Sequence, residues 1–188
     1  MTEPEFLSLI QCNPNNAAIL ERLPQLGQAD CWLVSGALFQ TVWNLRSGLA
    51  PAHGILDYDI FYFDPDTSWD AEDRVIARGN AVFADLGVMV QIRNQARVHL
   101  WYGEKHGLPY PPLRCSTEGI DRFLTRNTRI GVRRMADGYD VYAPVGFDDA
   151  AGLIVRPNPG PNFSPESYAV KAARWKQLWP EVTVLAVE

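Results

Sequence analysis

Apolar residues along this chain fall into two patterns, short unbroken runs and longer stretches with helical spacing. The run at residues 32–34 predicts a strand, and a Ser-Gly turn at 35–36 follows it directly. From 37 to 46, apolar residues recur every three or four positions, which predicts a helix. An apolar and aromatic run at 60–63 predicts a second strand that is buried. The central pattern is therefore strand, turn, helix, loop and strand.

The rest of the chain follows the same two patterns. Helices are expected at 4–11, 14–24, 68–86 and 164–178, with a further helix opening at Ser116. Strands are expected at 86–92, 127–133 and 139–143, and the three prolines within 103–115 predict a loop there. The Asp-Gly pair at 137–138 predicts a hairpin between the last two strands, because this pair favours tight turns.

Two carboxylates, Asp57 and Asp59, stand at the head of the second strand. Residues two apart on a strand share a face, with α-carbons about 6.5 Å apart. Two like charges side by side are costly to bury, so the pair is unfavourable as plain core. A divalent cation between them removes the conflict, and carboxylate oxygens are ligands that Mg²⁺ prefers. The pair is therefore a candidate metal site.

Length and composition predict one domain. The chain has 188 residues, 47% of them hydrophobic, which is enough for a substantial core. We expect a single domain over 1–188, made of N-terminal helices at 1–30, a core at 31–158 and a C-terminal helix at 159–188. The net charge of −5 provides no basic strip, which argues against an extended nucleic-acid surface.

Cysteine usage and the N-terminal segment predict a cytoplasmic protein. Cys12, Cys31 and Cys115 are far apart and show no zinc-binding spacing, so we expect free thiols in a reducing compartment. The first ten residues are acidic and have no signal-peptide pattern, and no apolar run reaches membrane-spanning length. We therefore expect no membrane partner.

Five blocks of sequence, taken in order, resemble a known family. They are SGALFQTVWN, LDYDIFYFDPD, IRNQARVHLWY, TRIGVR and APVGFDDAAGLIVRPNP, and they cover most of residues 30–158. The family consists of small stand-alone bacterial proteins called nucleotidyltransferase-like, within the polymerase-beta-like nucleotidyltransferase superfamily. The order of glycine turn, helix and Asp-x-Asp is also similar to that of the tRNA CCA-adding enzymes. The resemblance implies an α+β fold, a small mixed or antiparallel sheet flanked by helices.

The resemblance also implies a reaction. A nucleoside monophosphate would pass from an NTP to an acceptor that the sequence does not identify, whether small molecule, protein or nucleic acid. Asp57 and Asp59 would be the catalytic residues and would hold Mg²⁺ or Mn²⁺. The candidate nucleotide-binding residues are Ser35, Gly36, Arg93, Asn94, Arg97 and Arg133.

Two physical arguments support these nucleotide-binding candidates. Ser35 and Gly36 would open a helix, whose free N–H groups and dipole attract phosphate. Arginine binds phosphate through two parallel hydrogen bonds, which suits Arg93 or Arg97. A structural pair between one of these arginines and the aspartates is an equally good interpretation, because a polar side chain beside an apolar strand needs a partner either way.

One position departs from the superfamily pattern. A third carboxylate usually comes from the strand expected here at 86–92, and the matching residue is Gln91, which is uncharged. That carboxylate commonly serves the metal that activates the attacking hydroxyl. Three hypotheses follow, in order of preference. The chain is a nucleotidyltransferase, or a nucleotide-binding or regulatory module with weak or no turnover, or an interaction domain whose aspartates only pair with arginines.

Overall fold

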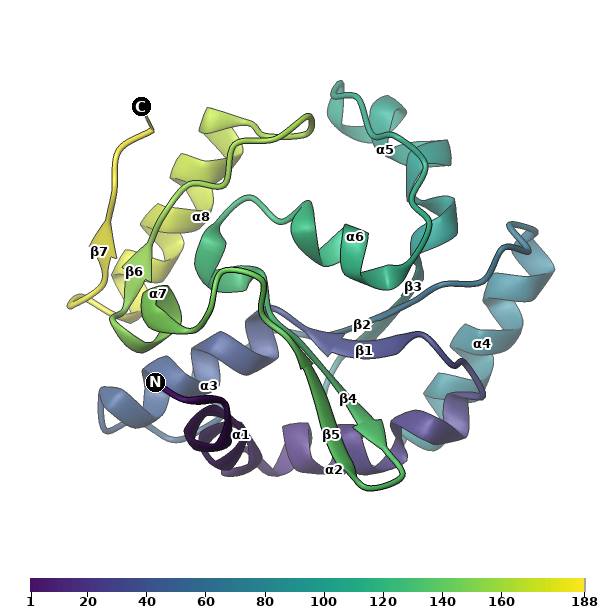
Figure 1. Ribbon diagram of the computed structural model, residues 1–188, viewed down its shortest axis with the longest axis horizontal. Helices are drawn as coiled ribbons and strands as arrows, with labels where there is room; N and C mark the ends of the chain where they lie inside the picture. Colours follow the sequence, from purple (N-terminus) through teal and green to yellow (C-terminus); the bar gives the residue numbers. More distant parts are fainter. Residues whose placement is uncertain (188) are drawn as a thin grey trace.

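A five-stranded mixed sheet forms the centre of the molecule (Figure 1). The computed structural model describes residues 1–187. The strands are β1 (Cys31–Val34), β2 (Tyr58–Tyr62), β3 (Val90–Asn94), β4 (Gly131–Met135) and β5 (Gly138–Tyr142), in the spatial order β3-β2-β1-β4-β5. Only β2 and β3 run parallel, and the other neighbours are antiparallel. The expected α+β fold with a mixed sheet is confirmed.

Helices cover both faces of this sheet (Figure 1). The helices that contact one face are α2 (Pro14–Arg22), α3 (Gly36–Arg46) and α4 (Trp69–Val82). The short helix α6 (Ser116–Asp121) lies over β1 and β2 on the other face. The remaining elements are α1 (Glu3–Gln11), α5 (Val98–His106), α7 (Asp148–Ala151), α8 (Pro165–Leu178), the 3-10 turns η1 (Leu23–Leu26), η2 (Gln95–Arg97) and η3 (Arg126–Thr128), and a small parallel pair, β6 (Ile154–Val155) and β7 (Thr183–Val184).

The alternation of side chains along β2 separates the core from the functional face. Tyr58, Ile60 and Tyr62 are buried on the side of α3 and α4, whereas the residues between them are partly exposed. On the core side α3 is almost wholly buried, and its Phe39 and Trp43 make edge-to-face contacts with Trp175 of α8. These aromatic contacts join the C-terminal helix to the centre of the domain.

Several predicted boundaries differ from the structure, and three of them have a clear local reason. The third strand begins at Val90 and not at residue 86, because the chain turns at Gly87, whose φ of +66° is left-handed. The fourth strand begins at Gly131, because 126–128 form the η3 turn. Part of the expected loop at 103–115 is helical, since α5 continues to His106 and ends at Gly107 in the left-handed conformation.

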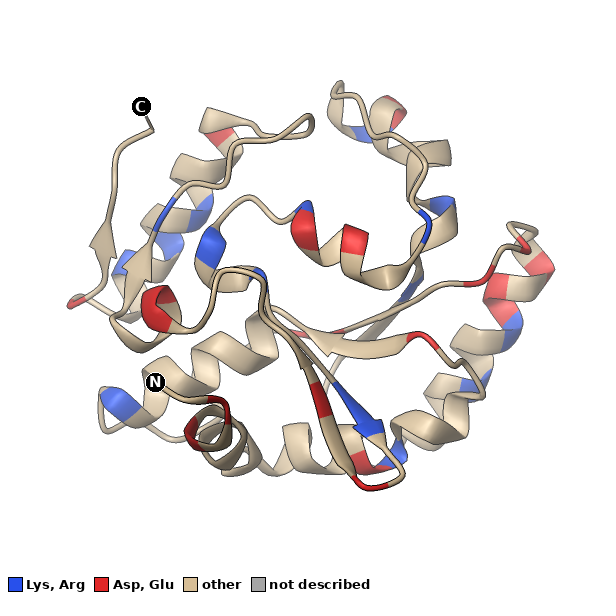
Figure 2. Ribbon diagram, viewed as in Figure 1, with Lys and Arg blue, Asp and Glu red and all other residues tan. Residues whose placement is uncertain are grey.

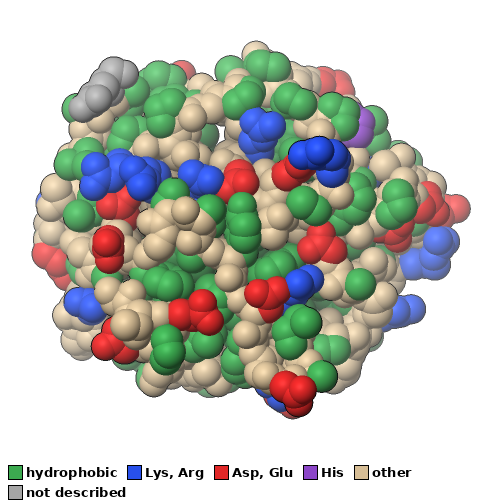
Figure 3. Space-filling view, viewed as in Figure 1, with side chains coloured by type: hydrophobic (Ala, Val, Ile, Leu, Met, Phe, Trp, Pro, Cys, Tyr) green, Lys and Arg blue, Asp and Glu red, His purple; other side chains and the backbone are tan. Residues whose placement is uncertain are grey.

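The surface carries acidic and basic residues mixed together, and the three cysteines, all in the described part of the chain, form no disulfide. Figure 2 shows acidic and basic residues interspersed over the elements, and the face seen in Figure 3 likewise mixes both signs with apolar side chains. The three cysteines are free, with Cys31 buried and Cys12 exposed. Among the described helices, none combines the length and apolar character needed to cross a bilayer.

Candidate functional site

Asp57 and Asp59 lie side by side at the start of β2. Asp59 pairs with Val34 of β1 and with Gln91 of β3, so both neighbouring strands frame it. Burial and the nearby carboxylate of Asp57 raise the pKa of Asp59 to about 6. Such a shift is the expected response of a partly desolvated carboxylate that shares its site with a second one. The two side chains therefore face the same space, as their spacing predicts.

The residue between the two aspartates fixes their position. Tyr58 is buried on the opposite face, where its hydroxyl accepts hydrogen bonds from the side-chain amides of Asn13 (3.2 Å) and Asn15 (3.0 Å). Asn13 also donates to the hydroxyl of Thr41 on α3. Because adjacent residues of a strand point in opposite directions, anchoring Tyr58 in the core holds both carboxylates toward the other face.

The Ser35–Gly36 turn adjoins the aspartates, because it follows Val34, the β1 partner of Asp59. Ser35 has a φ of +54°, a strained conformation for a residue with a side chain. Its N–H donates to the carbonyl of Ile130, so that amide is already engaged. Within residues 1–187, the N–H groups of Gly36 and Ala37 have no acceptor, and they open the first turn of α3. The free amides of this turn thus come from residues 36 and 37.

Gln91 occupies the place next to the aspartates on β3. It pairs with Asp59 in the sheet, and its Nε2 donates to Oδ2 of Asp57 at 2.8 Å. The amide therefore offers Asp57 a hydrogen-bond donor where a carboxylate would repel it. Within residues 1–187, no group of three or more His, Cys, Asp or Glu side chains is arranged to hold a metal ion.

Arg93 is the predicted cation that the fold brings closest to this pair. It lies two residues beyond Gln91 on the same face of β3, opposite Phe61 of β2. Its positive charge acts on Asp59, where it lowers the carboxylate pKa against the larger raising effects of burial and Asp57. The guanidinium makes no ion pair within the described part of the chain. Arg93 is thus available to an anionic ligand.

The fold does not bring Arg97 and Asn94 to the aspartates. Asn94 pairs with Tyr62 at the far end of β2, where its side chain caps η2 and binds the backbone of Asp64. The buried Arg97 forms an ion pair with Glu72, with 2.9 Å between Nε and Oε2, and lies 4.1 Å over the ring of Trp69. Both side chains stabilise the junction of β3 with α4, and the carboxylate partner of Arg97 is neither Asp57 nor Asp59.

Arg133 also lies away from the pair. Its guanidinium forms an ion pair with Asp140 of β5 (2.7 Å between Nη2 and Oδ2) and stacks 4.4 Å above the ring of Trp32. These contacts tie β4 to β5 and β1. Arg133 therefore stabilises the sheet, and Asp140 already balances its charge.

Lys171 of α8 was not among the sequence candidates, yet it lies within electrostatic range of the aspartates. Crowding by the surrounding chain lowers the pKa of its ammonium, and the charges of Asp59 and Asp57 oppose that effect. The residues on either side of Lys171 at helical spacing are Ser167 and Arg174, so one stripe of α8 is polar and basic. This spacing is the signal in the sequence that could have identified Lys171.

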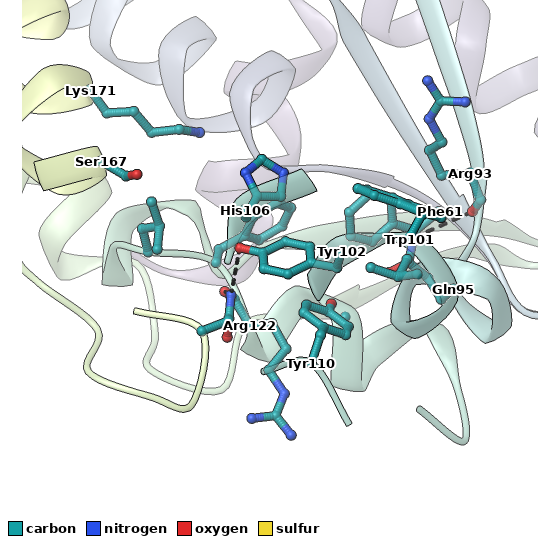
Figure 4. Close-up of a pocket in the computed structure, with 15 residues that line it drawn as sticks. Phe61, Arg93, Gln95, Trp101, Tyr102, His106, Tyr110, Arg122, Ser167 and Lys171 are labelled. Carbon is teal, nitrogen blue, oxygen red and sulfur yellow. Dashed lines mark hydrogen bonds between the residues drawn. The ribbon is translucent and has the colours of Figure 1, made fainter. Parts of the chain in front are cut away.

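A pocket of about 300 Å³ opens beside the pair (Figure 4). Phe61 and Arg93 from the sheet form part of its lining, and Lys171 lines it from α8. Six of its fifteen described lining residues are aromatic, and five of these six come from α5 and from the segments that follow α5 and α6. A second, open hollow on the β3 side contains Gln91 and shares Arg93 and Trp101 with the first. Asp57 and Asp59 are not among the described lining residues, but Phe61 of the first cavity and Gln91 of the second are neighbours of Asp59 on the same face of the sheet.

Comparison with known proteins identifies the class. A family model described as nucleotidyltransferase matches residues 21–184, and the chain belongs to this family. A solved structure, described as an NMR structure that reveals a CCA-adding enzyme head domain, is similar in fold, with a TM-score of 0.78. It is 24% identical in sequence, and the match covers 99% of this chain and 97% of that one, a likeness that shows the fold alone. Curated proteins gave no significant match.

Proposed function

We propose that this protein transfers a nucleoside monophosphate from an NTP to an acceptor, with a divalent cation held by Asp57 and Asp59. Membership of the nucleotidyltransferase family and the nucleotidyltransferase fold support the reaction class. The single observation that carries the site is the convergence of two carboxylates, one with a pKa raised to about 6, beside a strained helix-opening turn. A carboxylate with a perturbed pKa beside a cavity is typical of a functional site.

The residues present suit Mg²⁺ or Mn²⁺. The side-chain carboxylate of Asp59 has no hydrogen-bond or ion-pair partner in the described chain, and the carboxylate of Asp57 keeps one oxygen free of protein donors. Mg²⁺ commonly takes one or two carboxylates and completes its coordination with water and phosphate oxygens. When bound, the ion would offset negative charge on the triphosphate.

In this proposal the chain itself positions the triphosphate. The amides of Gly36 and Ala37 and the hydroxyl of Ser35 bind phosphate oxygens at the start of α3. Arg93 and Lys171 balance the charge that neither the ion nor the turn neutralises. The acceptor oxygen attacks the α-phosphorus, the bond from that phosphorus to the bridging oxygen breaks, and pyrophosphate leaves. A hydroxyl acceptor loses its proton in this step, and Gln91, which is an uncharged amide, is not the base that takes it.

A separate observation supports a second function, that of a nucleotide-binding module with weak or no turnover. Gln91 stands where a third carboxylate is usual, and its amide is committed to Asp57 at 2.8 Å. One cation would then be well held, while a second would find one carboxylate too few. Such a module binds NTP with Mg²⁺ and releases it unchanged.

The test is an assay for pyrophosphate release and labelled product, with Mg²⁺, each NTP and a panel of hydroxyl, phosphate and RNA acceptors. We expect Asp57→Asn and Asp59→Asn to abolish transfer. The matched control is Asp73→Asn, which removes an exposed carboxylate from α4. Equal transfer by the variants and the wild type contradicts the proposal. Calorimetry separates the two functions, because the module binds Mg²⁺ and NTP without product.

A further inference from the structure

We propose that the aromatic pocket beside the aspartates holds the nucleoside of the NTP, an inference that rests on the proposed function. The pocket contains rings from four parts of the chain. Its aromatic lining residues are Phe61, Trp101, Tyr102, His106, Tyr110 and Phe123 (Figure 4). A volume of about 300 Å³ falls in the range of small-molecule sites and suits a base with its ribose.

The rings already pack as a stacking platform. The ring centroid of Tyr102 lies 4.5 Å from that of His106 and 4.5 Å from that of Tyr110. Phe61 and Phe123 are stacked at 5.4 Å and form another part of the wall. Four of the six rings belong to residues that are partly exposed or exposed on α5 and its following loop, so their faces are not consumed by the core. Every nucleobase has a flat π-face, so each of them can stack on such a ring.

The charges of the lining favour a ligand that carries phosphate. Arg93, Arg122 and Lys171 line the pocket, and no Asp or Glu is among its described lining residues. Figure 4 shows Lys171 and Arg93 at opposite ends of the pocket. An uncharged aromatic ligand would have no use for three cations, whereas a nucleotide brings both a flat ring and negative charge.

The pocket is placed correctly for the proposed reaction. Phe61 comes two residues after Asp59 on the same face of β2, so the pocket begins one side chain beyond the carboxylates. Lys171 lines the pocket and also lies within electrostatic range of both aspartates. A nucleoside stacked on the rings therefore directs its 5′-phosphates toward Asp57 and Asp59.

Two amide oxygens in the pocket favour a base with an exocyclic amino group. The Nδ2 of Asn162 donates to the carbonyl of Arg122, and the Nε2 of Gln95 donates to the carbonyl of Arg93. Within residues 1–187, the side-chain oxygens of Asn162 and Gln95 accept no hydrogen bond. Free amide oxygens accept from amino groups, and side-chain amides are common partners of adenine. Adenosine is therefore the probe, with uridine as the comparison.

The experiment measures adenosine binding without metal or phosphate, by ligand-observed NMR up to millimolar concentration. We expect wild-type protein to bind adenosine more tightly than uridine. Tyr102→Ala and Trp101→Ala should each weaken adenosine binding about tenfold, the loss expected for one base–aromatic stack. Tyr102→Phe should restore it. Leu100→Ala, an exposed neighbour on α5, is the matched control and should bind as wild type does.

The outcomes separate this inference from the proposed function. Asp57→Asn should bind adenosine normally, because the nucleoside has no phosphate to bring a cation. Adenosine binding in this pocket without any transfer activity would remove only the proposed function. Transfer activity with the same KM for ATP in wild type, Tyr102→Ala and Trp101→Ala would overturn the nucleoside pocket alone. Thermal melting of each variant confirms that it is folded.

Discussion

Gln91 donates a hydrogen bond to Asp57 across the start of strands β2 and β3, with 2.8 Å between Nε2 and Oδ2. The glutamine is thus not a neutral bystander at the position where the superfamily pattern has an acid. It supplies a donor to one of two converging carboxylates and lowers the cost of holding them together without a cation. Exchanging this donor for an acid should therefore shift the balance between the metal-free and metal-bound protein.

The first prediction concerns Gln91→Glu. In EDTA the variant should lose about 1–2 kcal/mol of unfolding free energy, because Asp57 loses a donor and gains a like-charged neighbour. In Mn²⁺ it should bind the ion at least tenfold more tightly, since a third carboxylate oxygen faces the site. Urea denaturation and calorimetry measure the two effects. Gln91→Met is the control, because it removes the donor without adding charge. Unchanged Mn²⁺ affinity in Gln91→Glu contradicts a metal at this pair.

The second prediction concerns pH. Burial and Asp57 raise the pKa of Asp59 from 3.8 to about 6, so the folded chain retains a proton that the unfolded chain releases between these values. The unfolding free energy of the metal-free protein should therefore fall as the pH rises from about 4 to 6. This loss of stability, which comes from the ionised Asp59 carboxylate, should persist above pH 6. The Asp59→Asn variant lacks this charge, so its unfolding free energy at pH 7.5 should exceed that of the wild type by about 1–2 kcal/mol, after allowance for partial exposure.

Denaturation in EDTA at pH 4 and pH 7.5 checks this sign. The stabilisation by Asp59→Asn should be much smaller at pH 4, where the folded carboxyl is protonated and the unfolded one is only about half ionised. Asp73→Asn, on the exposed face of α4, should show no such pH dependence. A gain of equal size at both pH values would mean that the cause is packing and not charge.

The sequence predicts those parts of the site that depend on local pattern. The turn at Ser35–Gly36 and the pair at Asp57 and Asp59 follow from strand and helix periodicity, and the fold places them together through the pairing of Val34 with Asp59. The third strand was predicted to begin too early because residues 86–90 are mostly apolar, and apolarity alone does not reveal the left-handed turn at Gly87.

The roles of the remaining site residues depend on contacts between segments that are far apart in the chain, and a single sequence does not reveal these contacts. Arg93 and Arg97 have the same chemistry and lie four positions apart in the sequence, yet Arg97 is matched by Glu72 from α4 and Arg93 has no ion pair in the described chain. Lys171 is more than 100 positions from the aspartates and reaches them only because α8 packs against α3. Neither fact follows from spacing or composition.

The third prediction tests the structural role of Arg97. Arg97→Met leaves Glu72 buried without its partner, so the protein should lose about 3 kcal/mol of unfolding free energy. At a temperature where the variant is folded, the KM for NTP should stay within twofold of wild type. Adding Glu72→Gln should recover part of the lost stability, because the orphaned charge is gone. A large rise in KM with little change in stability would instead make Arg97 a nucleotide ligand.

The last prediction concerns Lys171, whose charge has two possible uses. If its ammonium binds phosphate, Lys171→Ala should raise the KM for NTP about tenfold and Lys171→Arg should restore most of the affinity. If it only balances Asp57 and Asp59 in the metal-free protein, the same variant should bind Mn²⁺ more tightly, because no fixed cation competes with the ion. Our proposal requires the rise in KM. Lys176→Ala, on the same helix but bonded to the carbonyl of Val182, should change neither value.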